Sequence, residues 1–169
     1  MSTAIRLHVG CGGDIRPGYV NIDAHDPRAD RKLRLEDLDY PDSSVEVIEG
    51  YMVIEHLTPA AAGDFVRNAR RMLVSGGRLV LECPDILKVS RLCLLFAADV
   101  ERTESGAFGL RGFFGEPTSH MTSGDFHKWG YTPATMERLL LGAGFASVAM
   151  DDGVSHGYPL RDMRATATK

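Results

Sequence analysis

A glycine-rich turn near the start of the chain carries the residues that point most directly to chemistry. It spans Gly10 to Gly13 and follows a short apolar run, while a second run, residues 20–23, ends in the carboxylate of Asp23. Glycine lets the backbone turn tightly and approach a ligand with no side chain in between. An acid at the end of the next parallel strand can accept hydrogen bonds from a ribose diol. The pattern predicts a nucleoside-type cofactor at the carboxyl ends of two strands.

Histidines and acids that follow the predicted strands are the candidates for catalysis. Glu55 and His56 begin the segment after the fourth strand, Asp85 follows the fifth, and His127 precedes a helix. Each has a structural alternative: Glu55 and His56 as a pair that caps the next helix, Asp85 as a helix start, and His127 as packing against a neighbouring aromatic ring. A histidine near a reacting hydroxyl can take its proton. His56 and His127 are therefore the predicted catalytic residues.

A metal site is not expected from the spacing of the ligand-type residues. His120 and His127 could share an ion with Asp125, but no third ligand stands on a rigid element. The three cysteines, Cys11, Cys83 and Cys93, match no metal motif. Their odd number and apolar surroundings argue against a disulfide framework and for a reducing compartment.

The composition limits the classes of protein to which the chain can belong. The 169 residues fit one domain, and 44% apolar with 25% charged residues is ordinary for a globular chain. A net charge of −4 does not suggest a nucleic-acid partner. The N-terminus lacks a basic-then-apolar signal pattern, and the most apolar run, residues 92–98, is too short to cross a bilayer. We expect a cytoplasmic protein with no membrane or nucleic-acid partner.

The elements that must position these residues follow from hydrophobic periodicity. Apolar or alternating runs predict seven strands, at 5–9, 20–23, 32–35, 45–49, 79–81, 146–150 and 163–168. Thr58-Pro59 and Thr132-Pro133 each mark the start of a helix. Residues 75–77 are expected to end the first of these helices, and residues 86–98 to form another.

Residues 101–126 read as an irregular segment with five glycines. A loop of that length in a small domain is usually functional or mobile. Aromatic residues crowd this stretch and could form a lid over an acceptor or a small satellite cluster; they are Phe113, Phe114, Phe126 and Trp129. His120 could contact a substrate there or lie in solvent. We expect a single domain, 1–169, in which residues 86–131 form an acceptor-side insertion or lid.

Strands that alternate with helices predict an α/β fold with a mostly parallel sheet. The last two strands are joined by a turn-rich connection without a helix, which predicts an antiparallel C-terminal hairpin. The expected architecture is a Rossmann-like, doubly wound, seven-stranded sheet. Ligands of such sheets bind at the carboxyl ends of the strands, at the topological switch point.

In this order the motifs resemble the class I S-adenosylmethionine-dependent methyltransferases, most closely the type 11 group. The matching segments cover most of residues 5–150; they are Val9 to Gly13, Asp23, residues 36–38, residues 51–57, residues 76–79 and residues 143–145. The resemblance implies S-adenosylmethionine as the cofactor. It further implies that the backbone at Gly10, Cys11 and Gly12 faces the methionine part of the cofactor.

The resemblance also implies roles for residues after the second, third and fourth strands. Asp23 would bind the ribose hydroxyls. Asp37 and Leu38 would flank the adenine, with Asp37 accepting from its exocyclic amine. Tyr51 and Met52 would wall the other side of the cofactor.

Two departures from the family pattern concern its early helices. Only residues 14–19, with Arg16-Pro17-Gly18, separate the turn from the second strand, and residues 24–31 are too short for the usual next helix. We therefore expect reduced helices after the first two strands and one thinly covered face of the sheet, which is compatible with a homodimer or a partner. The acid also follows the turn by about ten residues, whereas a dinucleotide fingerprint needs about 20.

The expected function is methyl transfer to a small-molecule or saccharide-type acceptor, as O-methylation, in small-molecule biosynthesis. The alternative is a catalytically inactive module that binds S-adenosylmethionine or S-adenosylhomocysteine and acts with a protein partner. A nicotinamide-dependent reductase is a third reading, which the short turn-to-acid spacing disfavours. The Asn/Asp-Pro-Pro-aromatic motif of enzymes that methylate amino groups of DNA or glutamine is missing, which further disfavours nucleic acid as acceptor.

Overall fold

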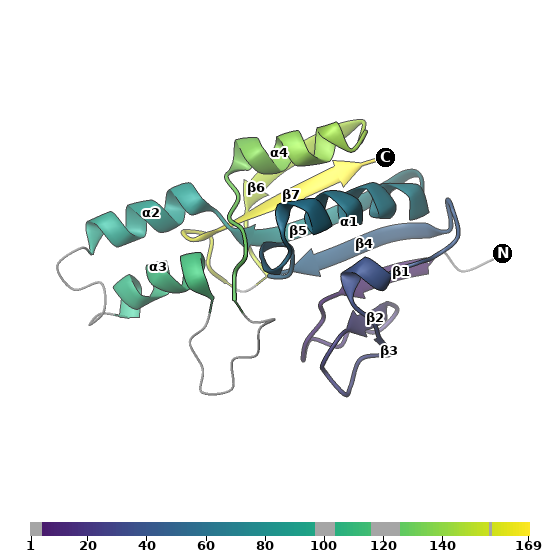
Figure 1. The fold of residues 1–169 in the computed structure, drawn as a ribbon, viewed down its shortest axis with the longest axis horizontal. Helices are drawn as coiled ribbons and strands as arrows, with labels where there is room; N and C mark the ends of the chain where they lie inside the picture. The colour runs from purple at the N-terminus through teal and green to yellow at the C-terminus, as the bar shows by residue number, and fades with distance from the viewer. Residues whose placement is uncertain (1–4, 97–103, 116–125, 156) are drawn as a thin grey trace.

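The structure, a computed structural model, describes residues 5–96, 104–115, 126–155 and 157–169. Its centre is a seven-stranded sheet in the order β3-β2-β1-β4-β5-β7-β6 (Figure 1). The strands are β1 (Ile5–Val9), β2 (Val20–Asp23), β3 (Arg31–Lys32), β4 (Val45–Tyr51), β5 (Leu73–Pro84), β6 (Ser147–Asp152) and β7 (Asp162–Thr168). The first five run parallel, and β7 pairs antiparallel with both β5 and β6. The predicted parallel sheet with its antiparallel hairpin is confirmed.

Helices connect the strands in the central and C-terminal parts of the chain. They are α1 (Pro59–Met72), α2 (Ile86–Leu95), α3 (Glu104–Phe114) and α4 (Pro133–Gly142), with short 3-10 turns η1 (Leu35–Asp37) and η2 (Ile54–His56). The two Thr-Pro starts are confirmed: Oγ1 of Thr58 accepts from the Ala61 N–H at 3.3 Å, and Thr132 forms a reciprocal capping box with Thr135.

One face of the sheet packs under α1 and α4, and this face holds the apolar core (Figure 1). Alternate residues of the central strands point into it and are fully buried, among them Leu7, Ile48 and Leu81. Phe65 and Val66 of α1 cover them from the helix side. Burial of this continuous apolar layer is the main source of stability for such a fold.

The opposite face carries the alternate residues of the same strands, and it is polar. His8 of β1 aligns with Glu49 of β4, and Tyr51 aligns with Glu82 of β5. In the described part of the chain, the connections after β1 and β2 contain no α-helix, as the sequence predicted. Tyr19 and Arg16, from the β1–β2 connection, contact this face through Glu49.

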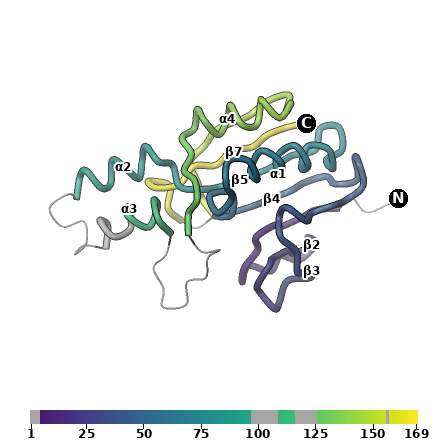
Figure 2. Tube along the Cα trace, viewed as in Figure 1, coloured from purple at the N-terminus to yellow at the C-terminus, as the bar shows by residue number. Residues whose placement is uncertain are grey.

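Two local expectations were wrong. Residues 104–114 form α3 rather than irregular loop, and α3 packs against α2 beyond the end of the sheet (Figure 2). Gly112 allows the close approach, since a Cβ there would lie 2.4 Å from Cγ2 of Val89. Residues 75–77 do not end a helix: α1 stops at Met72 and they lie inside β5, where the pairing with β4 is irregular.

Strand lengths also differ from the expected ones at the sheet edge. The third strand is reduced to two residues, Arg31 and Lys32, because the following chain turns into η1. No helix among the described residues is long and apolar enough to cross a membrane.

Candidate functional site

A cavity of about 440 Å³ lies at the carboxyl ends of β1 and β4. It is lined by His8, Gly10, Cys11, Gly12, Gly13, Asp14, Arg16, Tyr51, Met52 and Ser155. Five of the eight predicted cofactor residues therefore line one cavity: Gly10, Cys11, Gly12, Tyr51 and Met52. The switch point of the sheet is at β1, where the chain passes from β3-β2-β1 on one side to β4 on the other.

The backbone of the glycine turn has the conformation that the sequence predicted. Gly10 has a φ of 62°, and a Cβ there would lie 2.5 Å from Cγ2 of Val53. Both facts make a side chain at this position costly. Gly12 has a φ of 47° with open space where a Cβ would be. Across the cavity Met52 also has a positive φ, 50°, which is uncommon for a residue with a side chain.

Asp23 holds the glycine turn in place but does not itself line the cavity. Its Oδ2 accepts from the Gly12 N–H at 2.9 Å, and its Oδ1 accepts from the N–H groups of His25 at 2.7 Å and Asp26 at 2.9 Å. Burial alone would raise the pKa of Asp23, but the three N–H donors outweigh it and the pKa is lowered. The carboxylate is therefore charged and fixed beside the turn.

The two residues predicted to flank an adenine lie apart from the cavity lining. Asp37 is exposed in η1, and the side chain of Leu38 is buried in the core at 1% exposure. The side chain of Leu38 is thus committed to packing, and the exposed Asp37 carboxylate is accessible to a ligand from solvent.

A polar network on the uncovered face supports the cavity. The Arg16 guanidinium pairs with Asp14 at 2.7 Å and with Glu49 at 2.8 Å, and it lies 4.6 Å from the centre of the Tyr51 ring. The Tyr51 hydroxyl donates to Glu49 at 2.9 Å. Burial raises the pKa of Tyr51 to about 12, and burial followed by the charge of Arg16 lowers the pKa of His8. His8 is therefore neutral and Arg16 charged at neutral pH.

Cys11, in the glycine turn, also has a shifted pKa. Burial, together with the charge of Asp23, raises the pKa of the thiol to about 11. It is a neutral, buried wall of the cavity and not an activated nucleophile.

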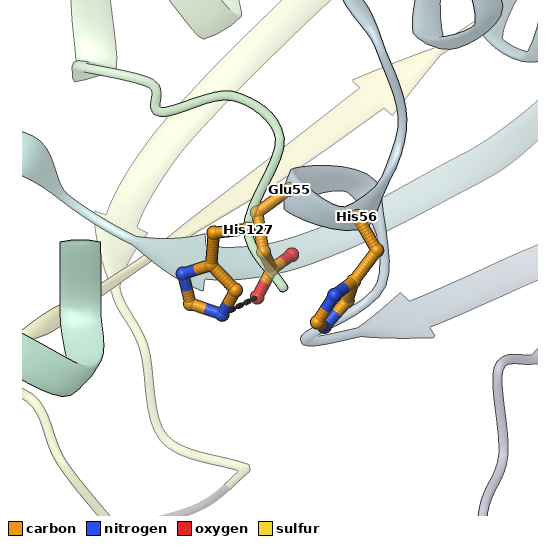
Figure 3. Close-up of side chains that lie close together, drawn as sticks. All are labelled: Glu55, His56 and His127. Atoms are coloured by element: carbon orange, nitrogen blue, oxygen red, sulfur yellow. Dashed lines mark ion pairs between the residues drawn. The ribbon is translucent and has the colours of Figure 1, made fainter. Parts of the chain in front are cut away.

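A second group of candidate side chains gathers near the end of β4, and it consists of Glu55, His56 and His127. Figure 3 shows the side chains of Glu55, His56 and His127 close together, with the carboxylate of Glu55 directed toward the ring of His127. Nε2 of His127 lies 3.9 Å from Oε1 of Glu55, and the two imidazole centroids are 5.0 Å apart. Backbone bonds hold the two segments together, because the Glu55 carbonyl accepts from Lys128 N at 2.8 Å and from Trp129 N at 3.2 Å. We call these three side chains the Glu55 cluster.

The Glu55 cluster is electrostatically unusual. Glu55 is 2% exposed, and neither carboxylate oxygen has a hydrogen-bond partner among the described residues. Burial raises the pKa of Glu55 to about 8, and burial lowers the pKa of His127 to about 4. The Nδ1–H groups of His127 and His56 donate to the carbonyls of Gly112 (3.1 Å) and Phe126 (3.2 Å). A carbonyl can only accept, so Nδ1 is the donor in each ring, and in the neutral form of either ring Nε2 carries the lone pair.

The structural alternatives that the sequence left open are correct for some of these residues and wrong for others. Thr58, not Glu55 or His56, caps α1. Asp85 caps a helix, as its structural alternative predicted, because its Oδ1 accepts a hydrogen bond from Leu87 N at 2.9 Å. The ring of His127 contacts His56 edge to face, a pairing that spacing did not suggest. His120 and Asp125 lie outside the described residues. Phe114, Phe126 and Trp129 are each at least half exposed.

The sequence analysis missed four lining residues of the cavity. His8, Asp14 and Arg16 flank the glycine turn. The alternation of side chains between the two faces of β1 could have identified His8, and the unusual Arg16-Pro17-Gly18 sequence could have drawn attention to Asp14 and Arg16. Ser155 comes from the β6–β7 connection, and its backbone N–H and hydroxyl, together with the N–H of Val154, hold it near β5 by hydrogen bonds to Glu82. No local signal marks such a residue.

No protein-family model matches the chain. Proteins from two strains of Mycobacterium tuberculosis, each named as a probable S-adenosylmethionine-dependent methyltransferase, are 31% identical over 134 residues. The match covers 79% of this chain and 38% of each relative, so the chain spans well under half the length of these relatives.

Solved structures share the fold at low sequence identity. A methyltransferase from Archaeoglobus fulgidus, described as dependent on S-adenosylmethionine, superposes with a TM-score of 0.64 at 12% identity, over 98% of this chain and 86% of that chain. The 1,6-didemethyltoxoflavin-N1-methyltransferase of Burkholderia thailandensis, solved with its substrate and S-adenosylhomocysteine, gives 0.61 at 15% identity, over 98% and 71%.

The sheet order, the glycine turn at its switch point and these superpositions define the class I methyltransferase fold. Over the 134 matched residues, the sequence is also similar to probable S-adenosylmethionine-dependent methyltransferases.

Proposed function

We propose that this chain binds S-adenosylmethionine in the cavity between β1 and β4 and transfers its methyl group to a small-molecule acceptor. The observation that carries the proposal is the turn from Gly10 to Gly13, held by Asp23 at the switch point and open to the cavity. Backbone N–H groups there can meet the carboxylate of the methionine part, and the Arg16 guanidinium on the cavity wall can pair with it.

Methyl transfer from a sulfonium is an in-line displacement, so the site must chiefly align the acceptor atom with the methyl group. We further propose a hydroxyl acceptor, as on a saccharide-type molecule, bound on the side of the Glu55 cluster. The cluster begins three residues after Met52, a lining residue of the cavity, and offers two imidazoles whose Nε2 can take up or redirect the hydroxyl proton. The Burkholderia neighbour also has a small molecule, 1,6-didemethyltoxoflavin, as its substrate.

The test is calorimetric titration of the full chain with S-adenosylmethionine and S-adenosylhomocysteine. Asp23→Ala removes the anchor of the turn and should weaken binding by at least about tenfold, or about 1.4 kcal/mol. Asp64→Ala, an exposed acid on α1, is the matched control and should bind as the wild type does. Equal binding by wild type and Asp23→Ala would contradict the assigned cavity.

Turnover is tested separately by transfer of a labelled methyl group to a panel of hydroxylated acceptors. His127→Ala should keep cofactor binding and lose methyl transfer. Cofactor binding by the wild type without transfer to any acceptor would favour the inactive binding module instead.

A further inference from the structure

We propose that Glu55, His56 and His127 form a binding site for a divalent transition-metal ion such as Zn²⁺. The remaining coordination positions would be open to water or to an oxygen of a bound acceptor. Metal binding by the cluster does not depend on methyl transfer; only the role of the acceptor oxygen rests on the proposed function.

The first observation is the convergence of three ligand-type side chains. Each contributes one potential ligand atom, and these atoms lie within 4.8 Å of one another (Figure 3). Zinc–nitrogen and zinc–oxygen bonds of about 2.0–2.2 Å place tetrahedral ligands about 3.4 Å apart. The 3.9 Å between Nε2 of His127 and Oε1 of Glu55 is therefore closed by a shift of about 0.5 Å, within reach of side-chain rotation.

The second observation is independent of spacing and concerns the buried carboxyl group of Glu55. Both oxygens lack a hydrogen-bond partner among the described residues, although the side chain is 2% exposed. A buried polar group without a partner is costly, and buried carboxylates are normally paired or bound to a metal. Arg161, whose charge acts on both Glu55 and His127, is already paired with Asp162 at 2.6 Å, so it does not satisfy Glu55.

The surroundings of the two imidazoles match those of metal ligands. A ligating histidine almost always donates its other ring N–H to a carbonyl or carboxylate, which orients the ring and fixes its tautomer. His127 does this toward Gly112 of α3, and His56 toward Phe126. Both rings are thus held by backbone atoms with Nε2 as the ligand nitrogen.

The donor set limits the identity of the ion. Two imidazole nitrogens and one carboxylate oxygen suit Zn²⁺ and Fe²⁺, whereas Mg²⁺ and Ca²⁺ prefer oxygen ligands throughout. Three protein ligands leave open positions, as in catalytic rather than structural zinc sites. A bound ion would polarise an oxygen ligand and ease loss of its proton to solvent. The histidines would then act through the ion and not as free bases.

The experiment is calorimetric titration of the full-length, tag-free chain with ZnCl₂ after removal of bound metals by a chelator. Co²⁺ serves as a second probe, because its visible absorption reports the ligands. We expect one site per chain, and Glu55→Gln and His127→Ala each to weaken it by at least about tenfold. His25→Ala, an exposed histidine outside the cluster, is the control and should bind as the wild type does.

Glu55→Gln is nearly isosteric and leaves the fold testable, and circular dichroism verifies that each variant is folded. A folded wild type that binds no Zn²⁺ or Co²⁺ overturns the proposal, as does binding that Glu55→Gln and His127→Ala leave unchanged. Titration of the same samples with S-adenosylmethionine separates this outcome from failure of the cofactor site: loss of metal binding with intact cofactor binding, or the reverse, assigns the failure to one site.

Discussion

The two faces of the sheet are built from the same strands but stabilised in different ways. The face under α1 and α4 is closed by apolar side chains such as Leu7, Ile48 and Phe65, all at most 2% exposed. The opposite face has no helix from the connections after β1 and β2, and its side chains bond to one another: Glu49 with Arg16, Tyr19 and Tyr51. The first face supplies stability, and the second supports the cavity wall. Variants on each face test this division.

The largest expected effect is on the helix-covered face. Phe65→Ala removes a buried ring from α1 and should lower the free energy of unfolding by about 3–5 kcal/mol, because both burial and packing are lost. Urea denaturation followed by circular dichroism measures it. A loss below about 1 kcal/mol would mean that this face is not the main core.

Glu82→Gln on the polar face should have a smaller effect. Glu82 is fully buried and accepts from Val154 N at 3.2 Å, from both the N–H and the hydroxyl of Ser155, and from Arg164. Replacement by the neutral amide weakens these charge-assisted bonds, for a loss of about 1–3 kcal/mol in the same denaturation assay. Because Ser155 lines the cavity, cofactor binding should weaken as well.

The pH dependence of the stability difference between the wild type and Glu82→Gln is an internal control. Burial alone would raise the pKa of Glu82, but its donors from Ser155, Val154 and Arg164 lower it below the usual value of 4.5. A depressed carboxyl pKa stabilises the fold above the unfolded value, and this stabilisation is lost as the pH falls through the folded value. The wild type and Glu82→Gln should therefore converge in stability below pH 4.5. A difference that stays constant with pH would contradict the charged state of Glu82.

Tyr51→Phe should destabilise the protein less than Phe65→Ala or Glu82→Gln, since the ring remains and only the hydrogen bond from the hydroxyl to Glu49 is lost. We expect a decrease of about 0.5–1.5 kcal/mol in the free energy of unfolding. The ring that walls the cavity is retained, so calorimetric binding of S-adenosylmethionine should survive. Loss of binding in a stably folded Tyr51→Phe would show that the hydroxyl itself contacts the ligand.

The smallest effect is expected at the solvent side of α1. Asp64 and Arg67 form an ion pair in which both side chains are more than half exposed, at 74% and 63%. Asp64→Ala should change the free energy of unfolding by less than about 0.5 kcal/mol, because solvent and salt screen such pairs. A larger loss, measured by urea denaturation, would show that surface charge contributes to the helix-covered face.

Local patterns predicted the elements that depend on neighbours in the chain. The strand boundaries of β1 and β2, both Thr-Pro helix starts and the antiparallel hairpin were all correct. The helix α3 was not predicted, because its five-glycine surroundings mask the periodicity and its close contact at Gly112 depends on α2. The extension of β5 back to Leu73 was missed because Leu73 pairs with Val45 of β4, a distant contact, while residues 75–77 lie in the irregularity between Leu73 and Arg78.

The sequence by itself determined the fold class and predicted the part of the candidate site that is contiguous in the chain. Gly12 of the glycine turn and Asp23 are only eleven residues apart, and the conformation of the turn follows from local sterics. Only the tertiary structure brought Glu55 and His56 next to His127, about seventy residues later, and left the buried carboxyl group of Glu55 without a hydrogen bond among the described residues. The physical reason is that local conformation is encoded by neighbouring residues, whereas burial and charge proximity depend on which distant segments the sheet edge draws together.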